Sequence, residues 1–297
     1  MKPFMKIMLL GKNGQVGWEL QRTMAPLGQV MALDWQELNL TDEQAIRRII
    51  RDICPDLLVN AAAYTAVDQA EEEQDLAMAV NGTAPGIIAE EVARYGAALI
   101  HYSTDYIFDG NQERPYTEKE SPNPINVYGK TKLAGEEAIR HAGAKHLIFR
   151  TSWVYGIRGK NFLKTIVRLA GEKDELKVVN DQYGAPTWSR MIAECTALVI
   201  ARCGGKIDHN NQGLYNLSAA GKTTWHGFAE AILNEMAKRG LKTPHLKAIS
   251  SAEYITRAKR PADSLLDNSL IKEKFGLCMP DWHTSMESAF LDFYLSD

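Results

Sequence analysis

The stretch KIMLLGKNGQVG, residues 6–17, decides the fold, because a short apolar run passes directly into three glycines. Gly11, Gly14 and Gly17 have the spacing G-x-x-G-x-x-G between a predicted strand and a predicted helix. In a dinucleotide-binding fold one such glycine makes the tight turn, one lets the backbone reach a pyrophosphate, and one lets helix and strand pack closely. Such a triplet also occurs as an ordinary turn, so the rest of the chain has to support this interpretation.

Short runs rich in Val, Ile and Leu alternate with longer segments of helical period along the first half of the chain. This alternation is typical of a parallel sheet covered by helices. It predicts strands at residues 6–10, 29–33, 56–60, 97–103 and 146–151, and helices at residues 15–25, 42–53, 75–95 and 127–142. The expected fold class is α/β, with a Rossmann-type doubly wound parallel sheet.

The second half of the chain is less regular. The pattern predicts helices at 161–172, 190–202, 225–239 and 281–295, strands at 176–179 and 213–218, and Thr224 as a helix N-cap. No linker or internal repeat separates two blocks. We therefore expect an NAD(P)-binding Rossmann domain at residues 1–155, to which later segments near 175–215 return, and a smaller C-terminal α/β substrate-binding domain, mainly residues 156–297, partly interleaved with it.

Composition excludes several classes of protein. Apolar residues make up 45% of the chain and charged residues 24%, which are values of a folded globular protein. The formal charge of −3 and the lack of a long basic run argue against a nucleic-acid partner. The N-terminal apolar run is too short for a signal peptide, and no stretch approaches the roughly 20 residues that span a bilayer, so we expect a cytoplasmic protein without a membrane partner.

The four cysteines, Cys54, Cys195, Cys203 and Cys278, are scattered without a C-x-x-C pair. Disulfide frameworks and zinc sites depend on such spacing, so neither is expected here and no metal ligand is assigned.

Asp34 closes the second predicted strand, 20 residues after Gly14. A dinucleotide fold places an acidic group there on the adenine ribose 2′-hydroxyl, and the alternative is a helix cap or a solvated loop charge. A carboxylate at this point repels a 2′-phosphate and favours NADH, whereas Lys12 nearby favours NADPH. The choice between the two cofactors therefore stays open.

Two further strand ends carry residues suited to a binding crevice, since ligands of open α/β sheets bind outside the carboxyl ends of strands. Small residues follow the third predicted strand in VNAAAYT, residues 59–65, where a bulky side chain would block a nucleotide. The alternative there is ordinary close packing. Ser103 and Thr104 end the fourth predicted strand, so the Thr104 hydroxyl is well placed to donate a hydrogen bond.

The predicted helix in NVYGKTKLAGEEA, residues 126–138, contains Tyr128 and Lys132 four residues apart on one face. We expect the ammonium to lower the pKa of the phenol, which would make Tyr128 a proton donor. Gly129 and Gly135 each cost about 1 kcal/mol in a helix interior. We expect a ligand or another chain close to Gly129, and close helix packing at Gly135. An isolated Y-x-x-x-K is usually structural, but this combination with the glycine turn, Asp34 and Thr104 is far more specific.

With STDYIFDG, RTSWVYG, NFLKT, NDQYGAPT and RPADSLLD, these motifs resemble the extended short-chain dehydrogenase/reductase family over nearly the whole chain. The resemblance implies hydride transfer from NADPH or NADH to the 4-keto group of a nucleotide-linked sugar. It implies Tyr128 as general acid, Lys132 on the nicotinamide ribose and Thr104 on the carbonyl.

The resemblance also implies the binding residues. Those for the cofactor are Gly11, Lys12, Asn13, Gly14, Gln15, Val16, Asp34, Asn39, Leu40, Ala63, Tyr64, Thr65, Tyr128 and Lys132. Those for the substrate are Thr104, Asp105, Trp153 and Arg260, with a packed core position as the alternative for Trp153. Asn39 stands where many relatives carry an acidic residue, which leaves the choice between NADH and NADPH open. Some relatives bind Mg²⁺ at a dimer interface, but its ligands do not map onto this chain; the resemblance allows a homodimer without fixing it.

Three alternatives share parts of this pattern. A sugar-nucleotide 4,6-dehydratase would carry Glu directly after the Thr-Asp pair, where this chain has Tyr106. A C4 epimerase or another ketosugar reductase stays open. So does a non-catalytic binding protein similar to the regulatory β subunit of methionine adenosyltransferase, which turnover without a partner protein would exclude.

Overall fold

The computed structural model describes residues 4–295, and its largest element is a six-stranded sheet in the order β10-β5-β4-β3-β1-β2. Every neighbouring pair of strands is parallel. The strands are β1 (Met5–Leu10), β2 (Gly28–Leu33), β3 (Leu57–Asn60), β4 (Ala98–Thr104), β5 (Lys145–Thr151) and β10 (Gly213–Asn216). This confirms the predicted parallel α/β sheet.

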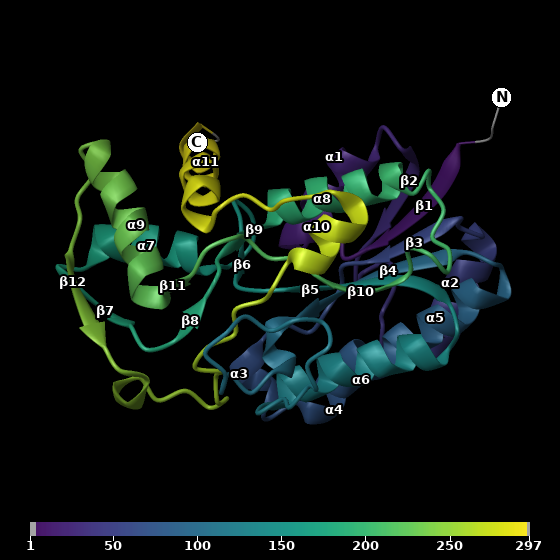
Figure 1. Cartoon of the computed structure of the whole chain (residues 1–297), viewed down its shortest axis with the longest axis horizontal. Coiled ribbons are helices and arrows are strands. Elements are labelled where there is room, and N and C mark those ends of the chain that lie inside the picture. Colours follow the sequence, from purple (N-terminus) through teal and green to yellow (C-terminus); the bar gives the residue numbers. More distant parts are fainter. Residues whose placement is uncertain (1–3, 296–297) are drawn as a thin grey trace.

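Helices cover both faces of this sheet, because successive strand side chains point to opposite sides. Ile7 and Leu9 belong to one core cluster, whereas Met8 and Leu10 belong to another. The first face is covered by α1 (Gln15–Met24), α8 (Ser189–Arg202) and α10 (Ser269–Phe275), and the second by α2 (Glu43–Ile53), α5 (Ala84–Arg94) and α6 (Val127–His141). Figure 1 shows the two groups above and below the strands.

The direction of winding reverses between β1 and β3. From β1 the chain first moves to β2 on one side and then crosses back to β3 on the other side. In open α/β sheets this switch point leaves a crevice outside the carboxyl ends of the two strands, which is where such folds bind ligands.

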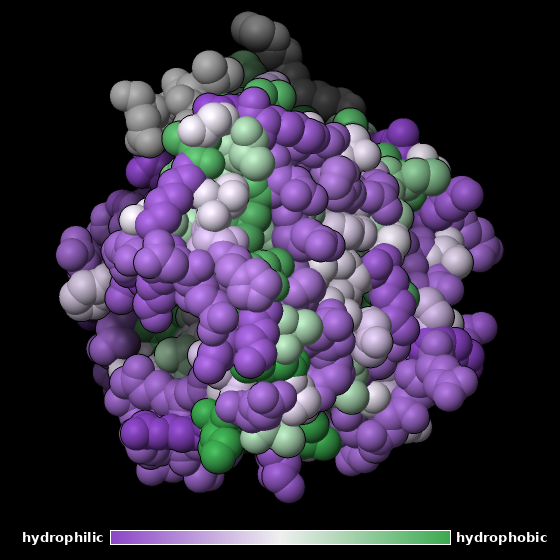
Figure 2. Space-filling model, turned by 90° about the vertical axis from the view of Figure 1, so that its left-hand side faces the viewer, coloured by the Kyte–Doolittle hydropathy of each residue, from purple (hydrophilic) through white to green (hydrophobic). Residues whose placement is uncertain are grey.

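A smaller lobe lies on the left in Figure 1 and has its own core. It is built from α7 (Phe162–Glu172), α9 (Trp225–Lys238), α11 (Trp282–Leu295) and a parallel pair of strands, β7 (Glu175–Val179) and β12 (His245–Ile249). Phe228, Ile232 and Phe290 are fully buried in it. The face of this lobe in Figure 2 is mostly hydrophilic, with apolar side chains in small separate groups.

Two short pairs of strands and one 3-10 turn complete the fold. The strand β6 (Val154–Tyr155) pairs with β9 (Thr187–Trp188), and β8 (Tyr183–Gly184) pairs with β11 (Thr223–Thr224). A 3-10 turn, Asp105–Ile107, follows β4 directly. Thr224 caps α9 as expected, since its hydroxyl accepts the Gly227 N–H at 3.0 Å.

The structure differs from the sequence expectation in two places. The expected helix 75–95 is α4 (Gln74–Met78), a π-helical turn (Ala79–Thr83) and α5 in succession. β7 falls within the segments expected to return to the large sheet, but it pairs with β12, so only α8 and β10 return. The division into two domains otherwise stays a prediction. None of the helices within residues 4–295 combines the length and the apolar character needed to cross a membrane.

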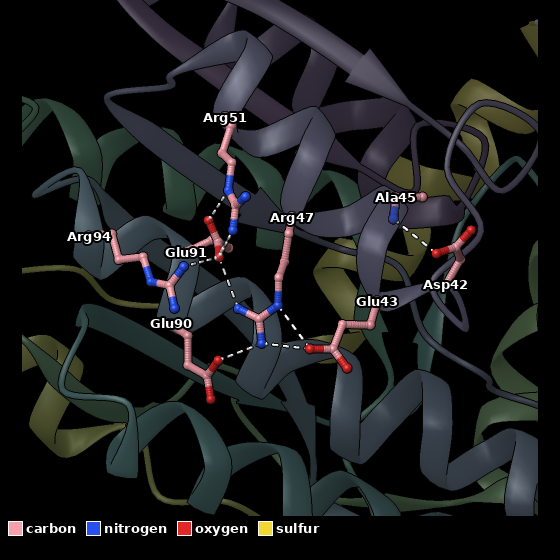
Figure 3. A network of polar contacts seen from close by, with 8 residues as sticks. All are labelled: Asp42, Glu43, Ala45, Arg47, Arg51, Glu90, Glu91 and Arg94. Atoms are coloured by element: carbon pink, nitrogen blue, oxygen red, sulfur yellow. Dashed lines mark hydrogen bonds and ion pairs between the residues drawn. The ribbon is translucent and has the colours of Figure 1, made fainter.

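An ion network ties α2 to α5 on the outside of the sheet (Figure 3). The buried carboxylate of Glu91 accepts hydrogen bonds from Arg47 at 2.9 Å, from Arg51 at 3.0 Å and from Arg94 at 2.9 Å. The hydrogen bond from Arg51 is the largest cause that lowers the pKa of Glu91 to about 2, and burial opposes it. Glu91 is therefore charged at neutral pH and holds the two helices together.

We expect Glu91→Gln to lower the free energy of unfolding by about 2 kcal/mol at pH 7, because three guanidinium groups lose their shared counter-ion. The neighbouring Glu90→Gln, whose side chain is half exposed, is the matched control and should cost less than about 1 kcal/mol. The folded-state pKa of Glu91 is lowered, so its contribution is present above pH 4.5 and lost as the pH falls toward 2. Urea unfolding of both variants from pH 7 to pH 3 tests this; an equal loss in both at every pH would contradict it.

Candidate active site

A cleft of about 550 Å³ opens at the switch point between β1 and β3. Most residues expected to bind a cofactor line it: Gly11, Asn13, Gly14, Gln15, Val16, Asp34, Asn39, Leu40, Ala63, Thr65, Tyr128 and Lys132. Lys12 and Tyr64 do not line it. The Lys12 ammonium pairs with Glu37, and the Tyr64 hydroxyl donates to Glu73 at 2.7 Å.

The glycine turn forms one wall of the cleft. Gly11 has φ +82°, and a Cβ there would lie 2.7 Å from the backbone nitrogen of Ala62. A Cβ at Gly17 would lie 1.9 Å from the carbonyl oxygen of Gly11, so helix α1 packs directly on the turn. Gly14 is the N-cap of α1, and no side chain caps it. The first-turn N–H groups therefore offer an anion site at the cleft.

Asp34 is held against this turn. Its carboxylate accepts the backbone N–H of Asn13 at 2.8 Å and that of Trp35 at 2.7 Å. It therefore links the end of β2 to the turn after β1 and is not the cap of α2, whose N-cap is Asp42.

Residues 156–161 lie beside the glycine turn, a position that the sequence did not predict. Gly159 and Lys160 of this segment line the cleft. The Asn161 amide donates to the Gln15 side chain at 3.0 Å, and the Arg158 guanidinium lies 3.3 Å from the centre of the Trp18 ring. The glycine and basic residues of GIRGKN were visible in the sequence, but no spacing rule says which loop lies over the turn. Trp35, Leu38, Val80 and Thr151 also line the cleft and were not predicted.

Tyr128 lines the cleft and is hydrogen-bonded to Thr104, which does not itself line it. Burial raises the pKa of Tyr128 to about 12, and a hydrogen bond with the Thr104 hydroxyl opposes this rise. The net shift is upward, which corrects the expectation that the Lys132 charge would bring the pKa of this phenol down. The Tyr128 ring also packs edge-on against Tyr106, with ring centroids 5.7 Å apart.

Asp105 is fully buried behind these hydroxyl groups. Its carboxylate accepts from the Thr104 hydroxyl at 3.0 Å and from the Ser152 hydroxyl at 2.9 Å. Burial raises its pKa to about 6. Asp105 does not line the cleft, so in this structure it acts on Thr104 from behind.

Lys132 is buried except where it lines the cleft. Its ammonium donates to the Tyr102 carbonyl at 2.6 Å and lies 3.2 Å from Nε2 of His101. Burial lowers the pKa of Lys132 to about 8, and the nearby charge of Glu136 opposes this. The Glu136 carboxylate is itself in a buried ion pair with Arg150, at 2.6 Å.

The two glycines of α6 have close neighbours within the same chain. A Cβ at Gly135 would lie 2.2 Å from the carbonyl oxygen of Asn81, which confirms close helix packing. A Cβ at Gly129 would lie 2.1 Å from the carbonyl oxygen of Tyr106. The expected ligand or second chain at Gly129 is therefore wrong, because the turn after β4 occupies that space.

Trp153 and Arg260, expected at the substrate, lie outside the cleft. The Trp153 ring stacks on Trp225 with centroids 3.6 Å apart, and its backbone has φ +46°. The Arg260 guanidinium donates to Asp68 at 3.2 Å, while its buried Nε has no hydrogen-bond partner among the described residues. Within residues 4–295 no group of three or more His, Cys, Asp or Glu side chains is arranged to hold a metal ion.

Comparison with known proteins gives a consistent set of matches. The family model described as "RmlD substrate binding domain" matches residues 5–295. The chain is 46% identical to a dTDP-4-dehydrorhamnose reductase of Burkholderia thailandensis, covering 94% of this chain and 95% of the relative. It is also 46% identical to the enzyme of that name in Escherichia coli K12, covering 95% and 96%. A crystal structure of the Bacillus anthracis enzyme of that name in complex with NADP matches with a TM-score of 0.90 and 33% identity, covering 97% and 99%.

We expect Gly129→Ala to lower the melting temperature by several degrees, because the added methyl group would lie 2.1 Å from a backbone oxygen that has little freedom to move. The control is Gly171→Ala in α7, where a Cβ meets nothing within 4 Å. This variant should be neutral or more stable by up to about 1 kcal/mol, since alanine favours a helix. Thermal unfolding of both variants is the measurement, and an undiminished melting temperature in Gly129→Ala would refute the close contact with Tyr106.

Proposed function

The chain belongs to the dTDP-4-dehydrorhamnose reductase family, and from that premise we propose that it reduces dTDP-4-dehydro-L-rhamnose to dTDP-L-rhamnose with NAD(P)H. The resemblance noted from the motifs is thereby confirmed. The observation that carries the proposal is a single cleft that joins the glycine turn and Asp34 to Tyr128 and Lys132. A binding crevice and a proton donor thus share one space, as a reductase requires.

The residues present fit a dinucleotide. The uncapped N-terminus of α1 suits the pyrophosphate, the Asp34 carboxylate suits the adenine ribose, and Asn39 and Leu40 line the adenine end. Ala63 and Thr65 line the wall at the end of β3, with Tyr64 behind them. When bound, the nicotinamide supplies the hydride for C4 of the sugar.

Tyr128 is the proposed proton donor. Its pKa of about 12 keeps the phenol protonated throughout the neutral range, so it has a proton to give. Tyr128 would give its phenolic proton to the 4-keto oxygen, which takes up the electron pair of the carbonyl π bond as C4 is reduced and becomes a hydroxyl group. Thr104 is proposed to turn its single hydroxyl hydrogen from the Asp105 carboxylate to that oxygen as its negative charge develops.

Lys132 is proposed to hold the nicotinamide ribose, because it lines the cleft together with Tyr128 and its ammonium group has three hydrogens to donate. Asp105, Trp153 and Arg260 are proposed on the substrate side. The orphaned buried Nε of Arg260 supports a role with an anionic group such as the substrate diphosphate. The homodimer and the assignment of the smaller lobe to the substrate stay predictions.

We propose that NADPH and NADH are both accepted. Both oxygens of Asp34 already accept backbone N–H groups, so its carboxylate has less freedom to receive a ribose hydroxyl. Lys12, the cation that would attract a 2′-phosphate, is paired with Glu37. The NADP in the Bacillus anthracis relative supports the phosphorylated cofactor.

We expect Tyr128→Phe to lose about 10²–10⁴-fold in kcat while binding of the cofactor is retained, because only the transferable proton is removed. The control is Tyr95→Phe, at the exposed C-terminus of α5. Absorbance of NADPH and of NADH is followed with dTDP-4-dehydro-L-rhamnose and no partner protein. Lack of turnover by the wild type despite cofactor binding would remove the reductase proposal and favour a non-catalytic binding protein.

We expect Glu37→Gln to favour NADPH, because it frees the Lys12 ammonium to approach the 2′-phosphate. The ratio of KM for NADPH to KM for NADH should fall about threefold, the scale of one partly exposed ion pair. The double variant Lys12→Ala/Glu37→Gln should not show this fall. Glu172→Gln, which breaks an exposed ion pair on α7, is the control. An unchanged ratio in Glu37→Gln would exclude Lys12 as a contributor to cofactor choice.

A further inference from the structure

His101 is a fully buried histidine in β4 that the proposed function does not use. Burial lowers its pKa well below the usual value, and the charge of Lys132 adds to the effect. The ring is therefore neutral at physiological pH, with one nitrogen carrying a hydrogen and the other able to accept one. The position of this hydrogen decides whether His101 donates a hydrogen bond to Lys132 or accepts one from it.

A line of contacts runs from the cofactor cleft to Lys132 through this ring. The backbone N–H of Ala62, which lines the cleft, donates to Oδ1 of Asn60 at 3.2 Å. Nδ2 of Asn60 lies 3.2 Å from Nδ1 of His101. Nε2 of His101 lies 3.2 Å from Nζ of Lys132, which donates to the Tyr102 carbonyl at 2.6 Å.

The hydrogen bond from Ala62 to Asn60 determines which atom donates in each of the following contacts. A backbone N–H only donates, so Asn60 must present its oxygen to Ala62 and its NH₂ group to His101. An NH₂ group only donates, so Nδ1 of His101 must accept. The hydrogen of the neutral ring then lies on Nε2 and points at Lys132.

This direction matters because an ammonium group has three hydrogens and no lone pair. The Nε2–H of His101 opposes a charged Lys132, whereas a neutral amine accepts from it and still donates to the Tyr102 carbonyl. On its own helix, Tyr128 lies one turn before Lys132 and Glu136 lies one turn after it, and the Glu136 charge is matched by Arg150 on β5.

We propose that His101 is a positioning residue for Lys132: held by Asn60 with its hydrogen on Nε2, it fixes the amine against the Tyr102 carbonyl and favours its uncharged form. The lowered pKa of Lys132, about 8 with burial as the main cause, agrees with this. His101 thereby sets the upper pH at which Lys132 still carries the charge that acts on the ribose.

The first test needs no activity. Two-dimensional ¹H–¹⁵N spectra of the wild-type protein at pH 7, with His101 assigned by comparison with His101→Gln or His101→Asn, report which ring nitrogen carries hydrogen. We expect a neutral ring protonated on Nε2. A ring protonated on Nδ1, or on both nitrogens, would overturn the proposal, whatever reaction the protein catalyses. His101 remains assignable by exclusion from the other six histidines if neither variant folds.

The second test rests on the proposed function. His101→Gln can present its side-chain oxygen to Lys132 and so favours the ammonium, which should move the alkaline limb of kcat/KM upward by about one pH unit. His101→Asn is too short to reach Lys132 and should lower kcat at all pH values. His146→Gln, a half-buried histidine on β5, is the control. A purely structural role for His101 predicts an unmoved alkaline limb in His101→Gln, and that result would overturn the proposal.

Discussion

The candidate site depends on how closely helix α6 lies against its neighbours. Gly129 contacts the Tyr106 carbonyl and Gly135 contacts the Asn81 carbonyl, and neither position has space for a Cβ. Lys132 lies between these two points and reaches the backbone of β4 at 2.6 Å. A helix displaced outward by a methyl group would lose that hydrogen bond. Each of the two glycines costs about 1 kcal/mol in helix propensity. Because neither has a Cβ, α6 lies close enough to β4 for Lys132 to make this hydrogen bond.

The π-helical turn Ala79–Thr83 contains Asn81, whose carbonyl group packs against Gly135 of α6. The side chain of Asn81 accepts the backbone N–H of Tyr64 and donates to the Tyr64 carbonyl, both at 2.9 Å, and it donates to the Thr131 hydroxyl at 3.3 Å. One residue therefore joins the wall after β3 to α6. π-helical turns inside α-helices are rare and often occur at functional sites, which agrees with this position beside the cleft.

Local patterns predicted most of what local geometry determines. The strand followed by Gly11, Gly14 and Gly17 predicted the turn, and the i, i+4 spacing placed Tyr128 and Lys132 on one helix face. Apart from the π-helical turn within the expected helix 75–95, the failures are non-local. No spacing rule says that residues 156–161 fold beside the turn, that the Tyr106 carbonyl faces Gly129, or that β7 pairs with β12. The pKa of Tyr128 was predicted in the wrong direction because burial, which depends on the whole fold, raises it and outweighs the hydrogen bond with Thr104.

Burial lowers the pKa of Lys132 to about 8, and the charge balance beneath α6 limits how far Glu136 opposes this. The Glu136 carboxylate lies one turn after Lys132 and is its natural partner on the helix, but both of its oxygens accept from the Arg150 guanidinium, at 2.9 and 2.6 Å. None of the ion pairs among the described residues includes Lys132, so the cost of burying its charge is not offset by a carboxylate of its own. If β5 carried an uncharged residue in place of Arg150, the attraction of Glu136 would act on Lys132 alone and raise its pKa. The buried pair Arg150–Glu136 therefore tunes the site from behind, without contact with the cleft.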